Sequence, residues 1–447
     1  VPFPSATNWS AVNFLDRGAY VVGAPEYILG QDFAALEKRT APYAAQGCRV
    51  LLLAQCDGAE IGRLHGVVIP LALLVLENPI RPNAPKVFDY FHTQGVDVKV
   101  ICGDNPVTVS AVAAQAGIRN AEQWVDAREL QTDQDIAAAV REYTVFGRVV
   151  PNQKRKIVRA LQSQGHTVAM TGDGVNDAPA LKVADIGCAM GVTGTDVAKG
   201  AADMILTDDN FATIVSAVEQ GRGIYANIKK AIHYLLSCNI GEILTIFLAT
   251  VFSFPHAPLS PVQLLWLNLV TDSLPALALG MEPVEKTVMR QPPRGKQDPL
   301  FSRAFSLRLA WQGAMVGGLT LLAYGLGLRL THDYAIANTM AFATLTLSQL
   351  FHAFDVRSEE TSLFRLGFFS NPAMNKAFLA GVVLQGLVLL LPPLQGAFSV
   401  VPMPLPQWGI VLGLAVTPLV VCEIEKAVRR ARTGRPAPVG KEAAVYR

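Results

Sequence analysis

The strongest constraint on the fold of this chain is an abrupt change in composition near Lys230. Before that residue, charged and apolar residues are mixed as in a soluble protein, whereas long apolar segments follow it. A helix needs about 20 residues to cross a bilayer. Buried helices of a large soluble domain are the alternative, but six such segments in a row with few charges favour an all-α transmembrane domain. The candidate spans lie near 231–254, 262–281, 306–329, 336–353, 376–394 and 407–425.

The distribution of charge predicts the membrane topology, and the small net charge bears on the kind of partner expected. The net charge of the 447 residues is only +2, so no nucleic-acid partner is expected. Basic residues gather in the loops after the second, fourth and sixth spans, on the side of the soluble region. The positive-inside rule makes that side cytoplasmic. These residues are Lys286, Arg290, Arg294, Lys296, Arg303, Arg357, Arg365, Lys376, Lys426, Arg429, Arg430 and Arg432.

Two neighbouring spans carry oxygen-bearing side chains. Asn239 and Glu242 are three residues apart on the first span, and Asn268, Thr271 and Asp272 share one face of the second. A carboxylate in mid-membrane costs roughly 2.5–3.5 kcal/mol on insertion scales. Interhelical hydrogen bonding is the alternative role for the amides and the hydroxyl. It accounts poorly for two acids in spans without Lys or Arg, so we expect a site for a hard cation.

In the soluble region the most informative stretch runs from Met170 to Leu181. The apolar run before Gly172 predicts a buried strand, and two carboxylates, Asp173 and Asp177, follow it. Ligands of open α/β sheets bind beyond the carboxyl ends of strands, and Gly172 and Gly174 let the backbone come close to one. An Asx-Gly turn is the plain alternative. Two carboxylates at such a place predict Mg²⁺ beside a phosphate.

Other segments of the soluble region also predict strands, an acid at a strand end and a bound anion. Val67 to Leu76 predicts a core strand, and the strand from Val96 to Cys102 is followed by Gly103 and Asp104. A basic helix start at Lys154 predicts a nearby anion, because cations are disfavoured there. Strands alternating with helices predict a doubly wound α/β fold.

These motifs resemble those of the P-type ATPases, cation pumps with a haloacid-dehalogenase-like core. The run Thr-Gly-Asp-Gly-Val-Asn-Asp-Ala-Pro-Ala-Leu at 171–181 is similar to their hinge motif. The stretches 237–242 and 264–280 resemble the fifth and sixth helices of sarcoplasmic-reticulum-type calcium pumps. The resemblance implies a haloacid-dehalogenase-like (Rossmann-like) phosphorylation domain followed by the membrane domain.

The resemblance also implies roles for individual residues. Asp173 would hold Mg²⁺ at the phosphorylation site, and Gln349 aligns with a glutamate of the two-calcium pumps. Two positions depart from the family, with Val22 in place of a lysine near the adenine and Cys102 in place of a threonine. The implied catalytic residues are Asp104, Lys154, Asp173, Asn176 and Asp177, the implied nucleotide-binding ones are Arg49, Gly103, Gly172 and Gly174, and the implied ligands of the transported cation are Asn239, Glu242, Asn268, Thr271, Asp272 and, less directly, Gln349.

The chain is expected to be the C-terminal half of such a pump. The phosphorylated aspartate of the family lies in Asp-Lys-Thr-Gly-Thr, which this sequence lacks, as it lacks the actuator domain and the first four membrane helices. The expected activity is ATP-driven Ca²⁺ transport with Mg²⁺, and the alternatives are a Mn²⁺ or Na⁺ pump, an anchored phosphatase of the same fold, or a non-catalytic membrane subunit. The expected domains are the end of a nucleotide-binding domain (1–65), the phosphorylation domain (66–225), the membrane domain (226–430) and a cytoplasmic tail (431–447).

Overall fold

The computed structural model describes residues 1–2, 8–77, 79–285, 287–290 and 299–433. The described residues divide into two compact units, one formed by those up to residue 217 and the other by those from residue 218 on. Most of the predicted tail, from residue 434 on, lies outside the described residues. So do Lys286, Arg294 and Lys296 of the first basic loop.

The first unit begins with a four-stranded antiparallel sheet in the order β1-β2-β3-β6. Its last strand is the predicted one, but the prediction of a core position is wrong. Ile69 is 54 % exposed and Leu76 is 50 % exposed, and seven of the eight residues of β6 are exposed, so the described residues leave both faces of this strand largely uncovered. The strands are β1 (Trp9–Phe14), β2 (Gly18–Gly23), β3 (Arg49–Cys56) and β6 (Ile69–Leu76), with a separate hairpin of β4 (Gly58–Glu60) and β5 (Arg63–His65).

Two parallel sheets of three strands each make up the rest of this unit. Their orders are β7-β9-β8 and β10-β11-β12. The connecting segments contain helices, which is the alternation that the sequence predicts. The strands are β7 (Val100–Ile101), β8 (Trp124–Asp126), β9 (Val145–Gly147), β10 (Ala169–Gly172), β11 (Ile186–Met190) and β12 (Met204–Leu206).

Local sequence signals begin several of these helices. Asn105 caps α4 by accepting a hydrogen bond from the Val107 amide at 2.9 Å, and Pro106 occupies the start of that helix. Thr132 and Asp135 form a capping box at the start of α5. The helices are α1 (Pro25–Leu29), α2 (Phe33–Ala45), α3 (Ala84–Thr93), α4 (Pro106–Gln115), α5 (Asp133–Glu142), α6 (Pro151–Ser163), α7 (Ala178–Val183) and α8 (Asp196–Ala201).

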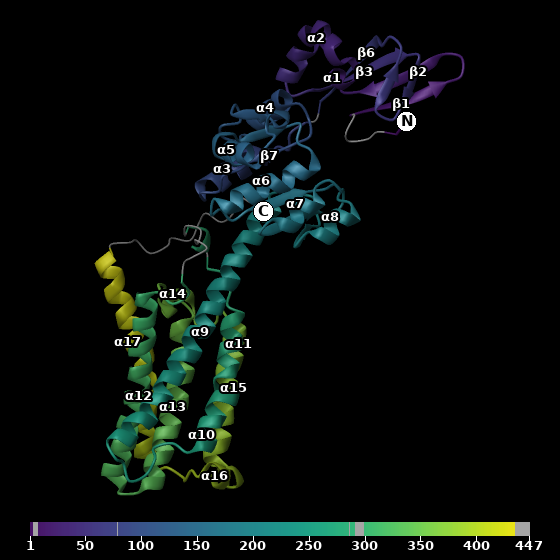
Figure 1. Ribbon diagram of the computed structural model, residues 1–447. Helices are drawn as coiled ribbons and strands as arrows, with labels where there is room; N and C mark the ends of the chain where they lie inside the picture. Colours follow the sequence, from purple (N-terminus) through teal and green to yellow (C-terminus); the bar gives the residue numbers. More distant parts are fainter. Residues whose placement is uncertain (3–7, 78, 286, 291–298, 434–447) are drawn as a thin grey trace. The chain divides into compact units, whose positions relative to one another are not determined.

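The second unit is a helical bundle (Figure 1). Its first helix, α9, begins in the last residues of the first unit, at Thr213. The next span is interrupted, since a π-helical turn separates α10 from α11. The elements are α9 (Thr213–Val251), α10 (Pro261–Trp266), the π turn (Leu267–Thr271), α11 (Ser273–Gly280), α12 (Arg303–Thr331), α13 (Tyr334–Val356), α14 (Leu363–Leu366), α15 (Pro372–Leu390), α16 (Pro392–Phe398) and α17 (Leu405–Thr433).

Five of the six predicted spans coincide with helical segments that are long and apolar enough to cross a membrane. The sixth, α13, has 23 residues but a more polar composition, with Thr339, Thr344 and Gln349 among them. Eighteen of those residues are buried by other helices. A helix enclosed by protein does not need a lipid-facing surface, which explains why its side chains are less apolar.

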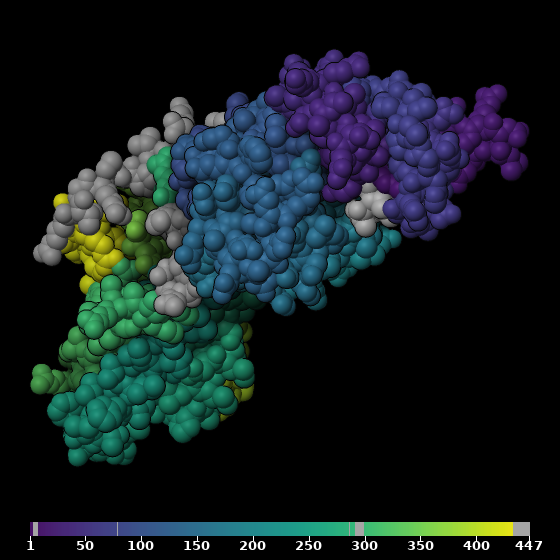
Figure 2. All heavy atoms as spheres, turned by 45° about the horizontal axis from the view of Figure 1, so that its top comes forward, coloured from purple at the N-terminus to yellow at the C-terminus, as the bar shows by residue number. Residues whose placement is uncertain are grey.

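Glycines allow α9 and α12 to pack closely. A Cβ added to Gly317 would lie 2.8 Å from the carbonyl oxygen of Gly241, and one added to Gly313 would lie 2.5 Å from Ile240 Cγ2. Small residues at such crossings are how membrane helices approach each other. In the space-filling view, side chains close the gaps that the ribbons leave between the helices of the second unit (Figure 2).

Candidate functional site

The predicted site in the first unit lies at the carboxyl end of β10. Asp173 follows this strand and is exposed, whereas Asp177, just before α7, is buried. A Cβ added to Gly172 would come within 2.5 Å of the Asp177 Cβ, so only glycine leaves room for that carboxylate. The amide of Gly174 donates to Asp177 Oδ2 at 3.2 Å. The loop geometry therefore depends on both predicted glycines.

Lys154 provides the charge partner of Asp177. It lies in the first turn of α6, and its Nζ is 2.6 Å from Asp177 Oδ1. Both side chains are largely buried, with 14 % and 10 % of their surface exposed. The anion that the basic helix start predicts is thus, in this structure, the Asp177 carboxylate.

A second pair lies at the end of β7. Arg49 Nη2 is 3.4 Å from Asp104 Oδ1, with both side chains partly exposed. The two residues line one hollow together with Glu26, Gly103 and Arg148. The Arg49 side chain is 54 % exposed, so its guanidinium can also bind a phosphate-bearing ligand in this hollow.

Cys102 lies close to these charged groups. The charges of Asp104, Lys154 and Arg49 all act on its thiol. Burial and then the carboxylate of Asp104 raise the pKa of the Cys102 thiol. The side chain is therefore a neutral thiol, which is a weaker hydrogen-bond donor than a threonine hydroxyl.

Sequence reasoning missed a network next to this site. Arg148 has a left-handed backbone, with φ of +50°, and its guanidinium donates to Asp126 Oδ2 at 2.7 Å and to Glu26 Oε1 at 2.6 Å. Burial alone would raise the pKa of Asp126, but hydrogen bonds from Arg128 and Arg148 outweigh it and lower the pKa to about 2. Asp126 ends β8, so the rule that located Asp104 and Asp173 also applies to it.

Glu242 is the centre of the predicted site in the second unit. It is buried on α9 and accepts two hydrogen bonds from other helical segments. Asn268 Nδ2 donates to Glu242 Oε2 at 2.6 Å, and Gln349 Nε2 donates to Glu242 Oε1 at 3.1 Å. Three of the predicted ligands therefore meet at one carboxylate.

Asp272 is buried beside the same helices. Its Oδ1 accepts from the Tyr234 hydroxyl at 3.3 Å, while its Oδ2 is buried and has no partner among the described residues. Tyr234 is on α9, two turns before Glu242, and no sequence motif pointed to it. An unsatisfied carboxylate oxygen in this setting is energetically costly unless a cation or proton meets it.

The backbone around Asp272 is irregular. The turn Leu267–Thr271 is π-helical, and the Asp272 amide donates to the Leu267 carbonyl at 2.9 Å. π turns occur preferentially at functional sites. Pro275 lies inside α11 and has no amide hydrogen to donate to the carbonyl of Thr271, four residues earlier, so a helical hydrogen bond is missing where the π turn ends.

Asn239 and Thr271 are not linked to the other predicted ligands. The Asn239 amide donates to the Leu235 carbonyl at 2.8 Å, and the Thr271 hydroxyl donates to the Leu267 carbonyl at 3.0 Å. Each side chain thus bonds to its own helix. Their oxygen atoms can still accept a cation.

Two protein families match the chain. Residues 3–185 match the family described as haloacid dehalogenase-like hydrolase, and residues 256–428 match the C-terminus of cation transporting ATPases. These matches, with the parallel sheets and apolar helices, confirm the predicted fold class and a multi-pass membrane protein with a soluble haloacid-dehalogenase-like domain.

Curated relatives agree with these families. Calcium-transporting ATPase 1 of Bacillus cereus is 42 % identical over 393 residues, which is 84 % of this chain and 44 % of the relative. Calcium-transporting ATPase type 2C member 1 of Mus musculus is 37 % identical over 457 residues, which is 96 % of this chain and 49 % of the relative. The chain spans about half the length of the curated relatives it matches.

Proposed function

This chain belongs to the cation-transporting P-type ATPases, and from that premise we propose that it is the C-terminal half of a pump that uses ATP to transport Ca²⁺. The observation that carries the proposal is the cluster of Glu242, Asn268 and Gln349 beside Asp272, in which every side chain but that of Asn268 is buried. It combines two acids with amide oxygens in the spans 231–254 and 262–281, which contain no Lys or Arg as a counter-charge. Hard cations such as Ca²⁺ prefer oxygen ligands of this kind.

The first unit would handle the phosphoryl group. Lys154 would neutralise phosphoryl oxygens, and its contact with Asp177 would hold it at the site. Arg49 would bind the phosphates of ATP, and Asp104 would position Arg49. Asn176 is exposed in the loop between Asp173 and Asp177 and would complete the pocket.

Mg²⁺ fits the residues at the end of β10. The Asp173 carboxylate is exposed and has no partner among the described residues, while its carbonyl accepts from the Thr195 amide at 2.8 Å, which fixes the loop. Asp173 would hold the ion, which when bound neutralises charge on a phosphate. The side chains of this site would orient the phosphate and exclude other orientations of it.

The missing half of the protein would supply the phosphorylated aspartate, the actuator domain and four further helices. β7 pairs with β9 and β10 pairs with β11, so each has a second edge without a partner among the described strands. Ile101 of β7 packs against both neighbouring apolar clusters, one with Phe146 and one with Met170. A strand from the missing half would pair with these edges, as free strand edges favour.

Coupling between the two sites would run along α9. This helix is continuous from Thr213 to Val251 and carries Glu242. A helix of this kind can transmit a displacement from the soluble unit to the cation ligands. The soluble unit would lie in the cytoplasm, as the basic loops predict.

The test uses the complete protein with its N-terminal half. Asp272→Asn should abolish Ca²⁺-dependent phosphorylation from ATP, whereas Asp333→Asn, in an exposed loop of the same unit, should leave it intact. Phosphorylation that is unchanged in Asp272→Asn would contradict the ion-site assignment. Repeating the assay with Mn²⁺ and Na⁺ identifies the ion, because oxygen ligands alone do not fix it.

A non-catalytic membrane subunit is the second candidate, favoured by Val22 and Cys102. A pump forms the acid-stable phosphoenzyme in the same assay, and a pseudoenzyme does not. Restoring the family residue with Cys102→Thr should increase phosphorylation if the thiol only weakens the chemistry. No phosphorylation in either form, with the fold intact, would support the non-catalytic reading.

A further inference from the structure

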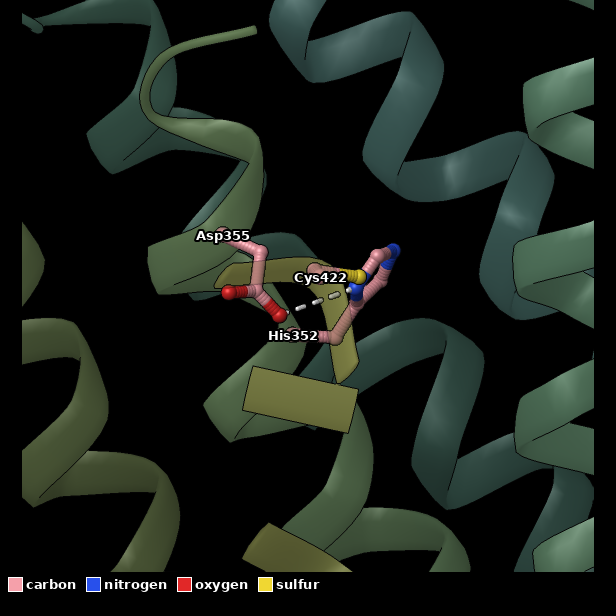
Figure 3. Close-up of side chains that lie close together, drawn as sticks. All are labelled: His352, Asp355 and Cys422. Atoms are coloured by element: carbon pink, nitrogen blue, oxygen red, sulfur yellow. Dashed lines mark ion pairs between the residues drawn. The ribbon is translucent and has the colours of Figure 1, made fainter. Parts of the chain in front are cut away.

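Three side chains of different ligand type converge in the second unit, outside the proposed transport site. His352 and Asp355 come from the end of α13, and Cys422 comes from α17 (Figure 3). One ligand atom from each lies within 4.8 Å of the other two, and all three residues are buried. This cluster contains none of the residues assigned above to the transported cation.

The polar atoms of this cluster are unsatisfied. Neither carboxylate oxygen of Asp355 has a hydrogen-bond partner among the described residues, and Asp355 is 3 % exposed. His352 Nδ1 lies 3.6 Å from Asp355 Oδ2, which is too long for a hydrogen bond. A buried carboxylate in this state needs a counter-charge.

Neighbouring residues orient two of the three ligands. His352 Nε2 lies 3.1 Å from Ser237 Oγ, which leaves Nδ1 on the side of Asp355. Gln312 Nε2 donates to Cys422 Sγ at 3.5 Å, and its Oε1 is held by His233 Nε2 at 2.6 Å. Metal-binding histidines commonly have their second nitrogen fixed in this way.

Nearby cations are bonded to other groups, and none of those described makes a hydrogen bond or ion pair with the Asp355 carboxylate. Lys426 Nζ is 3.1 Å from Glu423 Oε1, and it donates to the backbone carbonyl of Asp355, not to the carboxylate. Arg308 pairs with Glu359 at 3.2 Å. Asp355, Cys422 and His233 line a small hollow between these helices, through which an ion can reach the cluster.

We propose that His352 Nδ1, the Asp355 carboxylate and Cys422 Sγ bind a Zn²⁺ ion. Nitrogen, oxygen and thiolate ligands together suit Zn²⁺, whereas Ca²⁺ prefers oxygen alone. A tetrahedral zinc ion holds its ligand atoms about 3.3–3.8 Å apart, so small side-chain rotations suffice. On binding, the Cys422 thiol releases its proton to solvent and the thiolate bonds to the metal. Water or His233, whose Nδ1 has no partner among the described residues, supplies the fourth ligand.

The experiment is a Co²⁺ titration of the purified full-length protein in detergent, because Co²⁺ replaces Zn²⁺ and a cobalt–thiolate bond absorbs characteristically. We expect one such site per chain, displaced by Zn²⁺. Cys422→Ser should remove the thiolate band, and Asp355→Asn should weaken binding by at least about 10-fold.

Cys238→Ser and Asp272→Asn are the matched controls, since Cys238 is also a buried thiol of the same bundle and Asp272 belongs to the proposed transport site. Both should keep the band. A band that disappears with Cys238→Ser and persists with Cys422→Ser overturns the proposal, as does the absence of any band in the unaltered protein. If Cys422→Ser does not fold, Asp355→Asn decides, checked by its elution as a single species.

Discussion

Lys154 and Asp177 form a largely buried ion pair that joins α6 to the loop after β10, with 2.6 Å between Nζ and Oδ1. The pair connects two motifs that are 23 residues apart in the sequence. The pair lies at the carboxyl end of a parallel strand, where ligands of such sheets bind. It is therefore both a structural contact and the charged part of the proposed phosphate site.

Replacing Lys154 by Met should destabilise the first unit by about 1–3 kcal/mol, because Asp177 would remain buried without its charged partner. Thermal unfolding followed by intrinsic fluorescence measures the change. Lys156→Met is the control, since its partner Asp133 is 80 % exposed and such a pair contributes about 0–1 kcal/mol. Equal effects of the two substitutions would contradict this reading.

Gly172→Ala should also destabilise the protein and displace Asp177. The added methyl group would lie 2.5 Å from the Asp177 Cβ, and the backbone there cannot retreat without breaking the Gly174 contact. Gly200→Ala provides the comparison, because an added Cβ in α8 meets nothing within 4 Å. That change should be neutral or stabilise by about 0.5–1 kcal/mol. Melting temperatures of both variants test the contrast.

The pH dependence of stability should reveal Asp126. Its pKa in the folded protein is about 2, below the ordinary 3.8, so ionised Asp126 stabilises the fold above pH 4 by about 2 kcal/mol. This contribution is lost as the pH falls from about 4 to 2. Asp126→Asn should therefore be less stable than the unaltered protein at pH 7, and the difference should shrink across that window. A constant difference between pH 7 and pH 2 would show that the charge is irrelevant.

Much of the fold is predictable because its signals are local. Strand-end acids, apolar segments and helix caps are each written in a few consecutive residues, so β7, β10 and five spans appear where they are expected. The burial of β6 is not predictable in this way, since it depends on which other elements pack over the faces of the strand.

The residues of the candidate sites also differ in whether a local sequence signal identifies them. Asp104, Asp173 and Glu242 stand out from sequence, but the contact of Tyr234 with Asp272 depends on packing between residues 38 positions apart. The π turn before Asp272 ends at Thr271, whose carbonyl lacks its helical donor because Pro275 has no amide hydrogen. Asp126 could have been predicted from the sequence, because it too is an acid at a strand end.

The buried pair of Arg357 and Glu282 should be the most sensitive contact of the second unit. Arg357 is fully buried and donates to both carboxylate oxygens, at 2.9 Å and 3.0 Å. Arg357→Met should cost about 3–5 kcal/mol, because Glu282 would be left as an uncompensated charge. Arg365→Met, at an exposed position, is the control. The double variant Arg357→Met/Glu282→Gln should recover part of the loss in melting temperature, and a purely additive result would argue against coupling.

Gln349→Glu tests the cation site by adding a negative charge, whereas Asp272→Asn removes one. The new carboxylate would lie beside Glu242, whose Oε1 now accepts from the Gln349 amide at 3.1 Å. Without a divalent ion, two adjacent buried carboxylates repel each other, so the melting temperature should fall below that of the unaltered protein. Saturating Ca²⁺ should then raise it by more than it raises that of the unaltered protein, since ligand binding to the folded state stabilises it.

Gln385→Glu is the matched control for this last effect. Gln385 is equally buried in the same bundle, but its side chain bonds to Trp266 instead of Glu242. A carboxylate there should lower the melting temperature with and without Ca²⁺ to the same extent, because Gln385 bonds to no acid among the residues that the structure describes. If Gln349→Glu behaves like Gln385→Glu, Glu242 does not face a cation site, and the carboxylate of residue 349 only adds an unfavourable buried charge.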